Sequence, residues 1–394
     1  MATELAVKPA HTFLYGEIVY LRPLEKADAK RAVTVRQTPF PESPERVEAW
    51  ITEDYAKSES SRSFTYAIVR TADDVAVGSI KFEKEGYLRF YLTVRIVPLC
   101  GESGNLWKAE AIELASEWLL NEVQIPTVIL KLPASDASLV DRLVGSGFVI
   151  TTRLREKKIV DGVRVDELTL QRFNDAWLVT MGDPMAIELQ RTGSGIARPV
   201  PAKLPATISL PKNATLIGQR VYLRPYRAKD LEESVLWTRR ETETFHIGGR
   251  QLPSLGEFVK DVDGDEQQDL PEFVFFSVCL IETDEMIGEV GLIHLDYINR
   301  NAETASWFQK PDFREHGYGS EAKHLLLEYA FDTLNFHMLE SCVRFENTRS
   351  SAALRKQGYR ESGRIAWMSF RDGAFSNFVT FDLLAEEWRA LSST

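Results

Sequence analysis

Cysteine is rare in this sequence, and long hydrophobic runs are absent. The 394 residues contain three cysteines, Cys100, Cys279 and Cys342, which lie far apart in the chain. An odd number at such spacings argues against a disulfide framework and a zinc site, and it favours a reducing compartment. No apolar stretch reaches the length of a membrane span, and the N-terminus lacks the basic and apolar regions of a signal peptide. We therefore expect a cytoplasmic protein with no membrane contact and no metal.

Positive charge is also scarce. The chain carries 47 lysines and arginines against 58 acidic residues, a formal net charge of −11. This balance disfavours nucleic acid as a partner and mildly favours cationic partners, although a solubilising surface explains it equally well. The hydrophobic content of 44% suffices for a core, and the length predicts two or three domains or one large one.

One segment of the sequence occurs twice. Residues Gly16–Pro23 recur as Gly218–Pro225, an offset of 218 − 16 = 202. Toward the other end of each copy, Phe148 corresponds to Tyr359, an offset of 359 − 148 = 211. A period of this length indicates tandem domains. We predict a first domain at 1–182, a proline-rich linker at 183–212 and a second domain at 213–394.

Each copy has the pattern of an α+β fold, with a mixed β-sheet flanked by helices. In the second copy, the periodicity of the apolar residues separates strands from helices. Strands are expected at 221–223, 273–281, 286–295, 303–309, 338–345, 363–370 and 376–384. Helices are expected at 229–238, 254–261, 320–333 and 349–357.

A loop with two glycines precedes the long helix of the second copy. It reads Arg314-Glu315-His316-Gly317-Tyr318-Gly319 and follows a strand-like run that ends at Phe308. A helix N-terminus offers unpaired backbone N–H groups and the positive end of the helix dipole. Because Gly317 and Gly319 have no Cβ, a ligand can approach the backbone closely. The loop is suited to a pyrophosphate, while the glycine patterns of a dinucleotide fold and of a P-loop are absent.

Two further motifs follow the loop in order. Asn347-Thr348-Arg349-Ser350 begins 347 − 317 = 30 residues after Gly317, and Lys356 and Gly358-Tyr359 come next. The ordered set resembles the GNAT superfamily of acetyl-CoA-dependent N-acetyltransferases. It is most similar to the RimJ/RimL-like branch, which includes ribosomal-protein N-terminal, polyamine and aminoglycoside acetyltransferases.

The resemblance implies acetyl-CoA as co-substrate, a primary amine as acceptor, and catalysis in the second domain. A strand edge before the glycine loop would hold the pantetheine arm through main-chain atoms, and the loop would hold the phosphates. Asn347 would bond the pantetheine amides or cap its helix. The residues expected to bind the coenzyme are Trp307, Phe308, Gln309, Arg314, His316, Gly317, Tyr318, Gly319, Ser320 and Asn347.

Acetyl transfer requires a neutral amine, a polarised thioester and, usually, a proton for the leaving thiolate. Glu303 is the predicted base because it lies in the strand before the glycine loop, where partial burial raises the pKa of a carboxylate. Glu289 and His294, on the preceding strand, are alternatives.

The general acid is harder to assign. Many members of the superfamily carry a tyrosine where Leu354 stands here. Ser350 is the nearest polar residue that can meet the sulfur or the pantetheine. Helix N-cap chemistry shared with Asn347 explains Ser350 equally well.

The first copy lacks the residues of the glycine loop. Aligned on that loop, Gly104 stands at the position of Gly317 and Leu106 at the position of Gly319. Asp136 replaces Asn347 and adds negative charge near an anionic coenzyme. We predict that the first copy is a pseudo-acetyltransferase that shapes or covers the active half.

The acceptor is less well defined. The segment 261–272 carries carboxylates at 261, 263, 265, 266, 269 and 272, which suit a cationic small molecule or peptide amine. A solvated acidic loop is an alternative reading, and a calcium loop is disfavoured by its glycine position. A protein N-terminal α-amine as acceptor, and a catalytically silent ligand-binding or scaffolding protein, remain competing functions. The chain is expected to be a monomer or a homodimer.

Overall fold

The chain divides into two units that interleave in sequence. The structure is a computed structural model that describes residues 12–31, 35, 42–55, 63–85, 89–96, 101–187, 197–198, 213–227, 229–230, 232–234, 270–308, 310–371 and 373–392. The N-terminal unit is Met1–Thr152 with Glu167–Ala186, and the C-terminal unit is Arg153–Asp166 with Ile187–Thr394. Within the described ranges, no helix has the length and hydrophobicity needed to cross a membrane.

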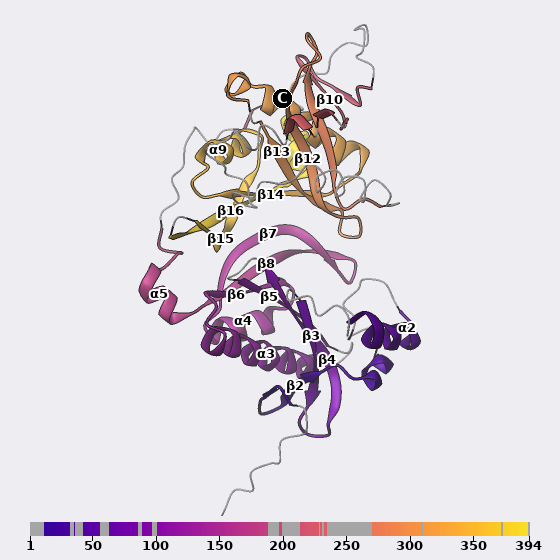
Figure 1. Ribbon diagram of the computed structural model, residues 1–394, viewed down its shortest axis with the longest axis vertical. Helices are drawn as coiled ribbons and strands as arrows, with labels where there is room; N and C mark the ends of the chain where they lie inside the picture. The colour runs from indigo at the N-terminus through magenta and orange to yellow at the C-terminus, as the bar shows by residue number, and fades with distance from the viewer. Residues whose placement is uncertain are drawn as a thin grey trace, which may run out of the picture. The chain divides into compact units, whose positions relative to one another are not determined.

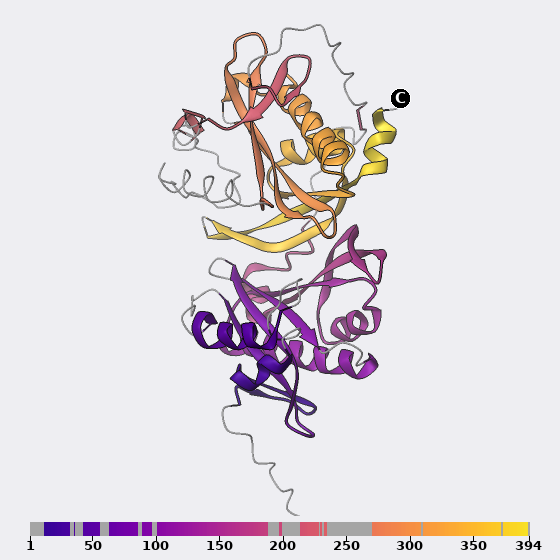
Figure 2. The ribbon, with the colours of Figure 1, turned by 90° about the vertical axis from the view of Figure 1, so that its right-hand side faces the viewer.

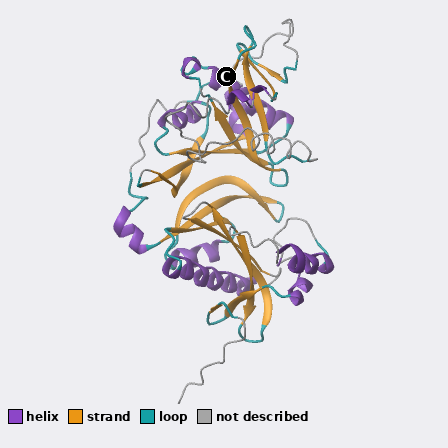
Figure 3. Cartoon of the chain, viewed as in Figure 1, coloured by secondary structure: helices purple, strands orange, loops and turns teal. Residues whose placement is uncertain are grey.

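The N-terminal unit is a mixed sheet with helices packed on it (Figure 1; Figure 3). Its strand order is β1-β2-β3-β4-β5-β6-β8-β7, and β5 and β6 are a parallel pair. The strands are β1 (Leu14–Tyr15), β2 (Val19–Pro23), β3 (Ser63–Arg70), β4 (Val75–Glu85), β5 (Arg89–Ile96), β6 (Thr127–Pro133), β7 (Val149–Val160) and β8 (Val163–Phe173). The helical segments are η1 (Lys26–Arg31), α2 (Pro44–Ala49), η2 (Trp50–Tyr55), α3 (Gly101–Glu117), η3 (Trp118–Glu122), α4 (Ala137–Gly145) and α5 (Asp175–Met181).

The C-terminal unit repeats this arrangement. Its strand order is β9-β10-β11-β12-β13-β14-β16-β15, with β13 and β14 as the parallel pair. The strands are β9 (Leu216–Ile217), β10 (Val221–Pro225), β11 (Val274–Leu280), β12 (Met286–Asp296), β13 (Asn301–Trp307), β14 (Met338–Arg344), β15 (Arg360–Arg371) and β16 (Ala374–Leu384). The helical segments are η4 (Pro311–Phe313), α8 (Tyr318–Glu328), η5 (Tyr329–Thr333), α9 (Thr348–Lys356) and α10 (Ala385–Ser392). Figure 2 shows α8 lying along the sheet of this unit.

Each unit has a hydrophobic core of its own between sheet and helices. In the C-terminal unit, the alternating residues Val290 and Leu292 of β12 face Ala322 and Leu326 of α8 within one buried cluster. Period-two alternation on a strand and a 3.6-residue period on a helix place these side chains on the facing surfaces. The sheet thus presents one apolar face to α8.

Two bonding arrangements occur at matching places in both units. Glu110 of α3 accepts hydrogen bonds from the backbone N–H groups of residues 17–19. Glu321 of α8 accepts the same kind of bond from the N–H groups of Arg220 and Val221. In each unit, a tyrosine of the next strand also bonds an aspartate: Tyr20 to Asp74, and Tyr222 to Asp284. The repeat in the sequence is therefore a repeat of local structure as well.

The predicted α+β class and its mixed sheets are confirmed. The predicted strands of the second copy match β10 to β16 within about three residues at each end. The helix predicted at 320–333 begins two residues earlier and ends as the π-helical turn η5. The helix predicted at 254–261, the acidic residues 261–269 and Gln309 lie outside the described residues.

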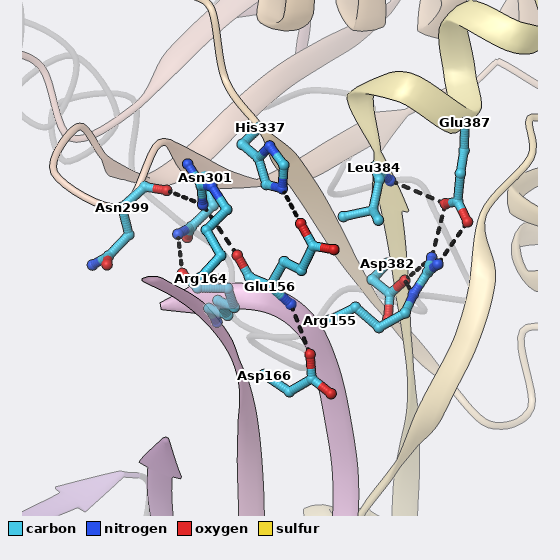
Figure 4. Close-up of polar contacts among 11 residues, drawn as sticks. Arg155, Glu156, Arg164, Asp166, Asn299, Asn301, His337, Asp382, Leu384 and Glu387 are labelled. Atoms are coloured by element: carbon cyan, nitrogen blue, oxygen red, sulfur yellow. Dashed lines mark hydrogen bonds and ion pairs between the residues drawn. The ribbon is translucent and has the colours of Figure 1, made fainter. Parts of the chain in front are cut away.

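The far end of the β7–β8 hairpin, residues 153–166, belongs to the C-terminal unit although the first sequence copy supplies it. Figure 4 shows its side chains among those of the C-terminal unit. Arg155 bonds Asp382, with its Nε 2.7 Å from Oδ1, and also bonds Glu387. Lys157 Nζ lies 2.7 Å from Glu340 Oε1 on β14. The first copy therefore contributes a structural part to the second.

Candidate functional site

The glycine loop connects β13 to the N-terminus of α8. Gly317 is the residue before the helix and has φ of +84°, a left-handed conformation that favours glycine. Gly319 lies against the ring of Phe308, which is 3.2 Å from the position that a Cβ would take. The backbone conformation thus favours glycine at 317, and a Cβ at 319 would press on Phe308. The first turn of α8 presents its N–H groups next to both residues.

An ion pair fixes this loop to the neighbouring edge of the sheet. Arg220 Nε lies 2.9 Å from Glu321 Oε2, and the same guanidinium donates to the carbonyl of His316 at 2.8 Å. It also stacks on the ring of Tyr318, 4.8 Å from the ring centroid. The backbone of His316 and the ring of Tyr318 therefore lie beside a cation at the helix N-terminus.

Arg314 closes the other end of the loop. Its Nε donates to the carbonyl oxygen of Phe308 at 2.9 Å, which ties the loop to the end of β13. The side chain is half-buried, as are Gly317, Tyr318, Gly319 and Ser320, whereas His316 is exposed. The loop residues expected to bind the coenzyme thus come together on one turn.

The parallel strands β13 and β14 separate halfway along their length. Their ladder runs from Asn301 and Met338 to Glu303 and Glu340. Beyond it, Ser341 Oγ donates to the carbonyl of Thr304 at 3.2 Å, and the strands continue to Trp307 and Arg344. Trp307 and Phe308 consequently lie at the edge of a gap in the sheet.

Glu303 lies at the last rung of this ladder. Its side chain is 13% exposed, and its Oε2 lies 3.2 Å from Nδ1 of His294. His294 has a positive φ of 54° at the irregularity between β12 and β13. This bulge brings together the predicted base and one of its two alternatives.

Glu289, the other alternative, is occupied elsewhere. It is buried on β12 and accepts a hydrogen bond from Ser234. Burial, followed by the charge of Glu289 and a hydrogen bond to it, raises the pKa of Tyr226 well above its usual value. Glu289 therefore belongs to a buried polar cluster with these two residues.

A set of polar residues lies where the β13–β14 ladder ends. Thr304 Oγ1 and the hydroxyl of Tyr359 are 3.0 Å apart, and Ser341 bonds the backbone of Thr304. Lys323 of α8 is 3% exposed, and burial lowers its pKa to about 7, partly offset by the charge of Glu303. Burial also raises the pKa of Tyr359. We call Thr304, Lys323, Ser341 and Tyr359 the cleft floor.

The N-terminal unit has aliphatic and aromatic residues at the same places. The β5–β6 ladder begins at the pair Arg89 and Thr127, and the β13–β14 ladder begins at the pair Asn301 and Met338. Matching these pairs gives an offset of 301 − 89 = 212 for the first strand and 338 − 127 = 211 for the second. Matching Glu110 of α3 with Glu321 of α8 gives an offset of 321 − 110 = 211 between the two helices. The counterparts of the cleft floor are thus Leu92, Ile112, Leu130 and Phe148, all members of the apolar core. Leu92, Ile112 and Leu130 line a cavity of about 220 Å³.

Among the described residues of the N-terminal unit, the positions that match the glycine loop are helical. Helix α3 begins at Gly101, which is 107 − 101 = 6 residues before the position that matches the start of α8. A helical backbone uses its N–H groups internally after the first turn, so this segment offers no phosphate cradle. The offset of 211 places Leu106 at Gly317 and Lys108 at Gly319, so the predicted alignment of Gly104 with Gly317 is wrong by two residues.

Asn347 caps helix α9. Its Oδ1 accepts from the backbone N–H of Ser350 at 3.1 Å, which is the N-cap arrangement. Leu354, at the position of the family's tyrosine, is buried in the core. Capping is one of the two roles expected for Asn347, and the coenzyme role of Asn347 and the catalytic role of Ser350 stay predictions.

Lys323 was missed in the sequence. Its neighbours Ala322, Leu326 and Leu327 carry the apolar period of the helix, and Lys323 lies on the same buried stripe. A lysine on a core-facing row is the signal that identifies it.

Comparison with known proteins identifies a family for part of the C-terminal unit. Residues 220–360 match the family model described as an acetyltransferase (GNAT) domain. The C-terminal unit contains a GNAT acetyltransferase domain. The protein is therefore an acyltransferase whose co-substrate is acetyl-CoA and whose acceptor is an amine.

Among similar proteins, the putative ribosomal N-acetyltransferase YdaF of Bacillus subtilis is 24% identical over 166 residues, 42% of this chain and 90% of that protein. Spermidine N(1)-acetyltransferase of Escherichia coli is 27% identical over 119 residues, 29% of this chain and 62% of that protein. A structure of spermidine N-acetyltransferase from Vibrio cholerae with CoA and spermine is similar at 21% identity and a TM-score of 0.40, covering 43% of this chain and 98% of that one.

Proposed function

We propose that residues 213–394 transfer the acetyl group of acetyl-CoA to a primary amine by direct attack of the amine on the thioester. The difference between the two units carries this proposal. The C-terminal unit has a glycine loop and a polar cleft floor, where the N-terminal unit has a longer helix and an apolar core. A chain that needed only the fold would not require a buried lysine, since burying a charge is costly.

In this proposal the coenzyme enters along the loop and the gap. Its pyrophosphate rests on the N–H groups at the start of α8, beside the Arg314 guanidinium. The pantetheine arm continues into the gap between β13 and β14, against the main chain of Trp307 and Phe308. The thioester then lies over the cleft floor, close to the end of the ladder at Glu303.

Glu303 takes the proton that the attacking amine must lose. The contact with His294 Nδ1 fixes its carboxylate at the mouth of the gap. Attack forms the C–N bond and expels the thiolate as the C–S bond breaks. Ser350 stays a candidate to meet the sulfur end of the coenzyme through its hydroxyl.

The acceptor we favour is a small cationic amine such as a polyamine. The name of the Escherichia coli relative and the net charge of −11 support it. The Bacillus subtilis relative named a ribosomal N-acetyltransferase favours a second candidate, a protein N-terminal α-amine. An acceptor screen separates them: spermidine and spermine on one side and a peptide with a free N-terminus on the other, with the acetylated product identified by mass.

The N-terminal unit has no catalytic part in this proposal and binds no coenzyme. It is a degenerate copy whose hairpin end completes the C-terminal unit. Domain limits near 183 and 212 and a cytoplasmic location remain predictions. Titration of the full chain with acetyl-CoA tests the proposal: binding supports it, and an absence of binding would leave a silent scaffold.

A further inference from the structure

The cleft floor of the C-terminal unit contains a cation that the proposed reaction has not yet used. Lys323 projects from α8, and its counterpart Ile112 lines the cavity beside the separating strands β5 and β6. The counterparts of Leu92 and Leu130 in that lining are Thr304 and Ser341, at the end of the β13–β14 ladder. By this correspondence between the units, Lys323 belongs to the row of α8 that packs over the end of the β13–β14 ladder, and the charge of Glu303 at that end acts on it.

The residues around Lys323 leave its charge weakly compensated. Glu303 on β13 is the carboxylate whose charge acts on it, and that carboxylate is already in contact with His294. The two other titratable groups on the same turn of α8 do not supply a counter-ion, because Glu321 is paired with Arg220 and His324 is buried with its pKa lowered to about 4. Tyr359 supplies no charge either, because its hydroxyl is hydrogen-bonded to Thr304.

We propose that Lys323 is the general acid that protonates the sulfur of coenzyme A as it leaves. This inference rests on the proposed function of the C-terminal unit. The amine nitrogen bonds to the acetyl carbon and its proton goes to Glu303. The C–S bond breaks with its electron pair on sulfur, and a proton moves from Lys323 Nζ to that sulfur. Glu303 then releases its proton to solvent and Lys323 takes one from solvent, so both groups are restored and the products are an amide and a free thiol.

Chemical matching supports this role. A free thiol has a pKa of about 8.5, and general acids work best when their pKa lies near the working pH. Burial brings Lys323 to about 7, so a proton transfer from its ammonium to a thiolate is downhill. The role also removes the need for a tyrosine at Leu354, which is buried in the core.

The test compares Lys323→Met, Lys323→Arg and, as matched control, Ile112→Met in the N-terminal unit. Thiol release from acetyl-CoA is followed from pH 6 to 10 with spermidine, with an N-terminally free peptide, and with neither. Binding of acetyl-CoA and the melting temperature are measured on the same samples. Arginine keeps the positive charge and cannot give up its proton, so it separates proton donation from electrostatic attraction.

We expect Lys323→Met to bind acetyl-CoA as the wild type does and to lose about 10²-fold or more in kcat. In the wild type, kcat should fall as the pH rises through neutrality and Lys323 loses its proton. This fall should be absent in Lys323→Met and in Lys323→Arg. Full activity in Lys323→Arg, or an unchanged pH profile in Lys323→Met, would overturn the inference. Ile112→Met should match the wild type. If the wild type itself binds no acetyl-CoA, the proposed function fails first.

Discussion

Lys323 stands in the C-terminal unit where Ile112 stands in the N-terminal unit. Both residues lie two positions after the glutamate, Glu321 or Glu110, that binds the backbone of the neighbouring strand turn. One unit thus places an ammonium where the other places an aliphatic side chain within the same framework. The fold therefore does not require a lysine at this position, and we attribute Lys323 to the proposed chemistry of the C-terminal unit.

The first prediction concerns the base. Glu303→Gln keeps the shape of the side chain and removes its ability to take a proton. We expect kcat to fall by about 10² to 10³-fold with little change in the KM for acetyl-CoA. Glu289→Gln, at the alternative position, should keep its kcat within a few-fold although it disturbs the contact with Ser234. Steady-state kinetics of both variants measure this. A larger loss of kcat in Glu289→Gln than in Glu303→Gln would identify Glu289 as the base.

The second prediction concerns the glycine loop. Gly319→Leu places a side chain beside the ring of Phe308, where even a Cβ would lie at 3.2 Å. The affinity for acetyl-CoA should drop by about tenfold or more, which corresponds to about 1.4 kcal/mol. Lys108→Leu, at the matching position of the N-terminal unit, should leave the affinity unchanged. Calorimetry on both variants checks this, and equal effects would argue that both units bind the coenzyme.

The third prediction follows from the burial of Lys323. Its pKa in the folded state, about 7, lies below the value of about 10.4 in an unfolded chain. Between these pH values the unfolded state binds more protons than the folded state. The free energy of unfolding therefore rises as the pH increases from 7 to about 10. Lys323→Met removes a penalty of about 4 kcal/mol at pH 7.

The stability difference between Lys323→Met and the wild type should therefore favour the variant at pH 7 and shrink toward pH 10. Urea unfolding at four pH values measures it. A difference that does not depend on pH would show that the ammonium is solvated in the folded protein.

The fourth prediction concerns the hairpin end. Lys157→Met leaves Glu340 on β14 without the ammonium that lies 2.7 Å from it. Breaking a buried pair in this way destabilises a protein by about 3 kcal/mol. Lys158→Met is the matched control, because Lys158 is more exposed and 3.9 Å from Asp296; it should change stability by less than about 0.5 kcal/mol. Equal melting temperatures for the two variants would mean that the hairpin end contributes no stability to the C-terminal unit.

Much of the fold could be read from the sequence, because apolar periodicity and turn residues act locally. The strands β11, β12 and β14 and the helices α8 and α9 were predicted close to their ends. The positive φ of Gly317 and the close approach of Phe308 to Gly319 are local features of the same kind, while the part of both glycines in coenzyme binding stays a prediction.

The features that were missed depend on distant parts of the chain. Lys323 becomes unusual only once α8 is packed on the sheet, and the contact of His294 with Glu303 needs a bulge that alternation does not reveal. The loop alignment failed because glycines were matched by type, whereas Glu110 and Glu321 set the true register. The placement of residues 153–166 in the C-terminal unit also has no local signal.

The most direct measurement is the stoichiometry of acetyl-CoA binding to the full chain by calorimetric titration. One site per chain is the predicted result, and Gly319→Leu should weaken it while Lys108→Leu should not. Two sites per chain would contradict the assignment of the N-terminal unit as a degenerate copy. No binding would contradict the proposed acetyl transfer altogether.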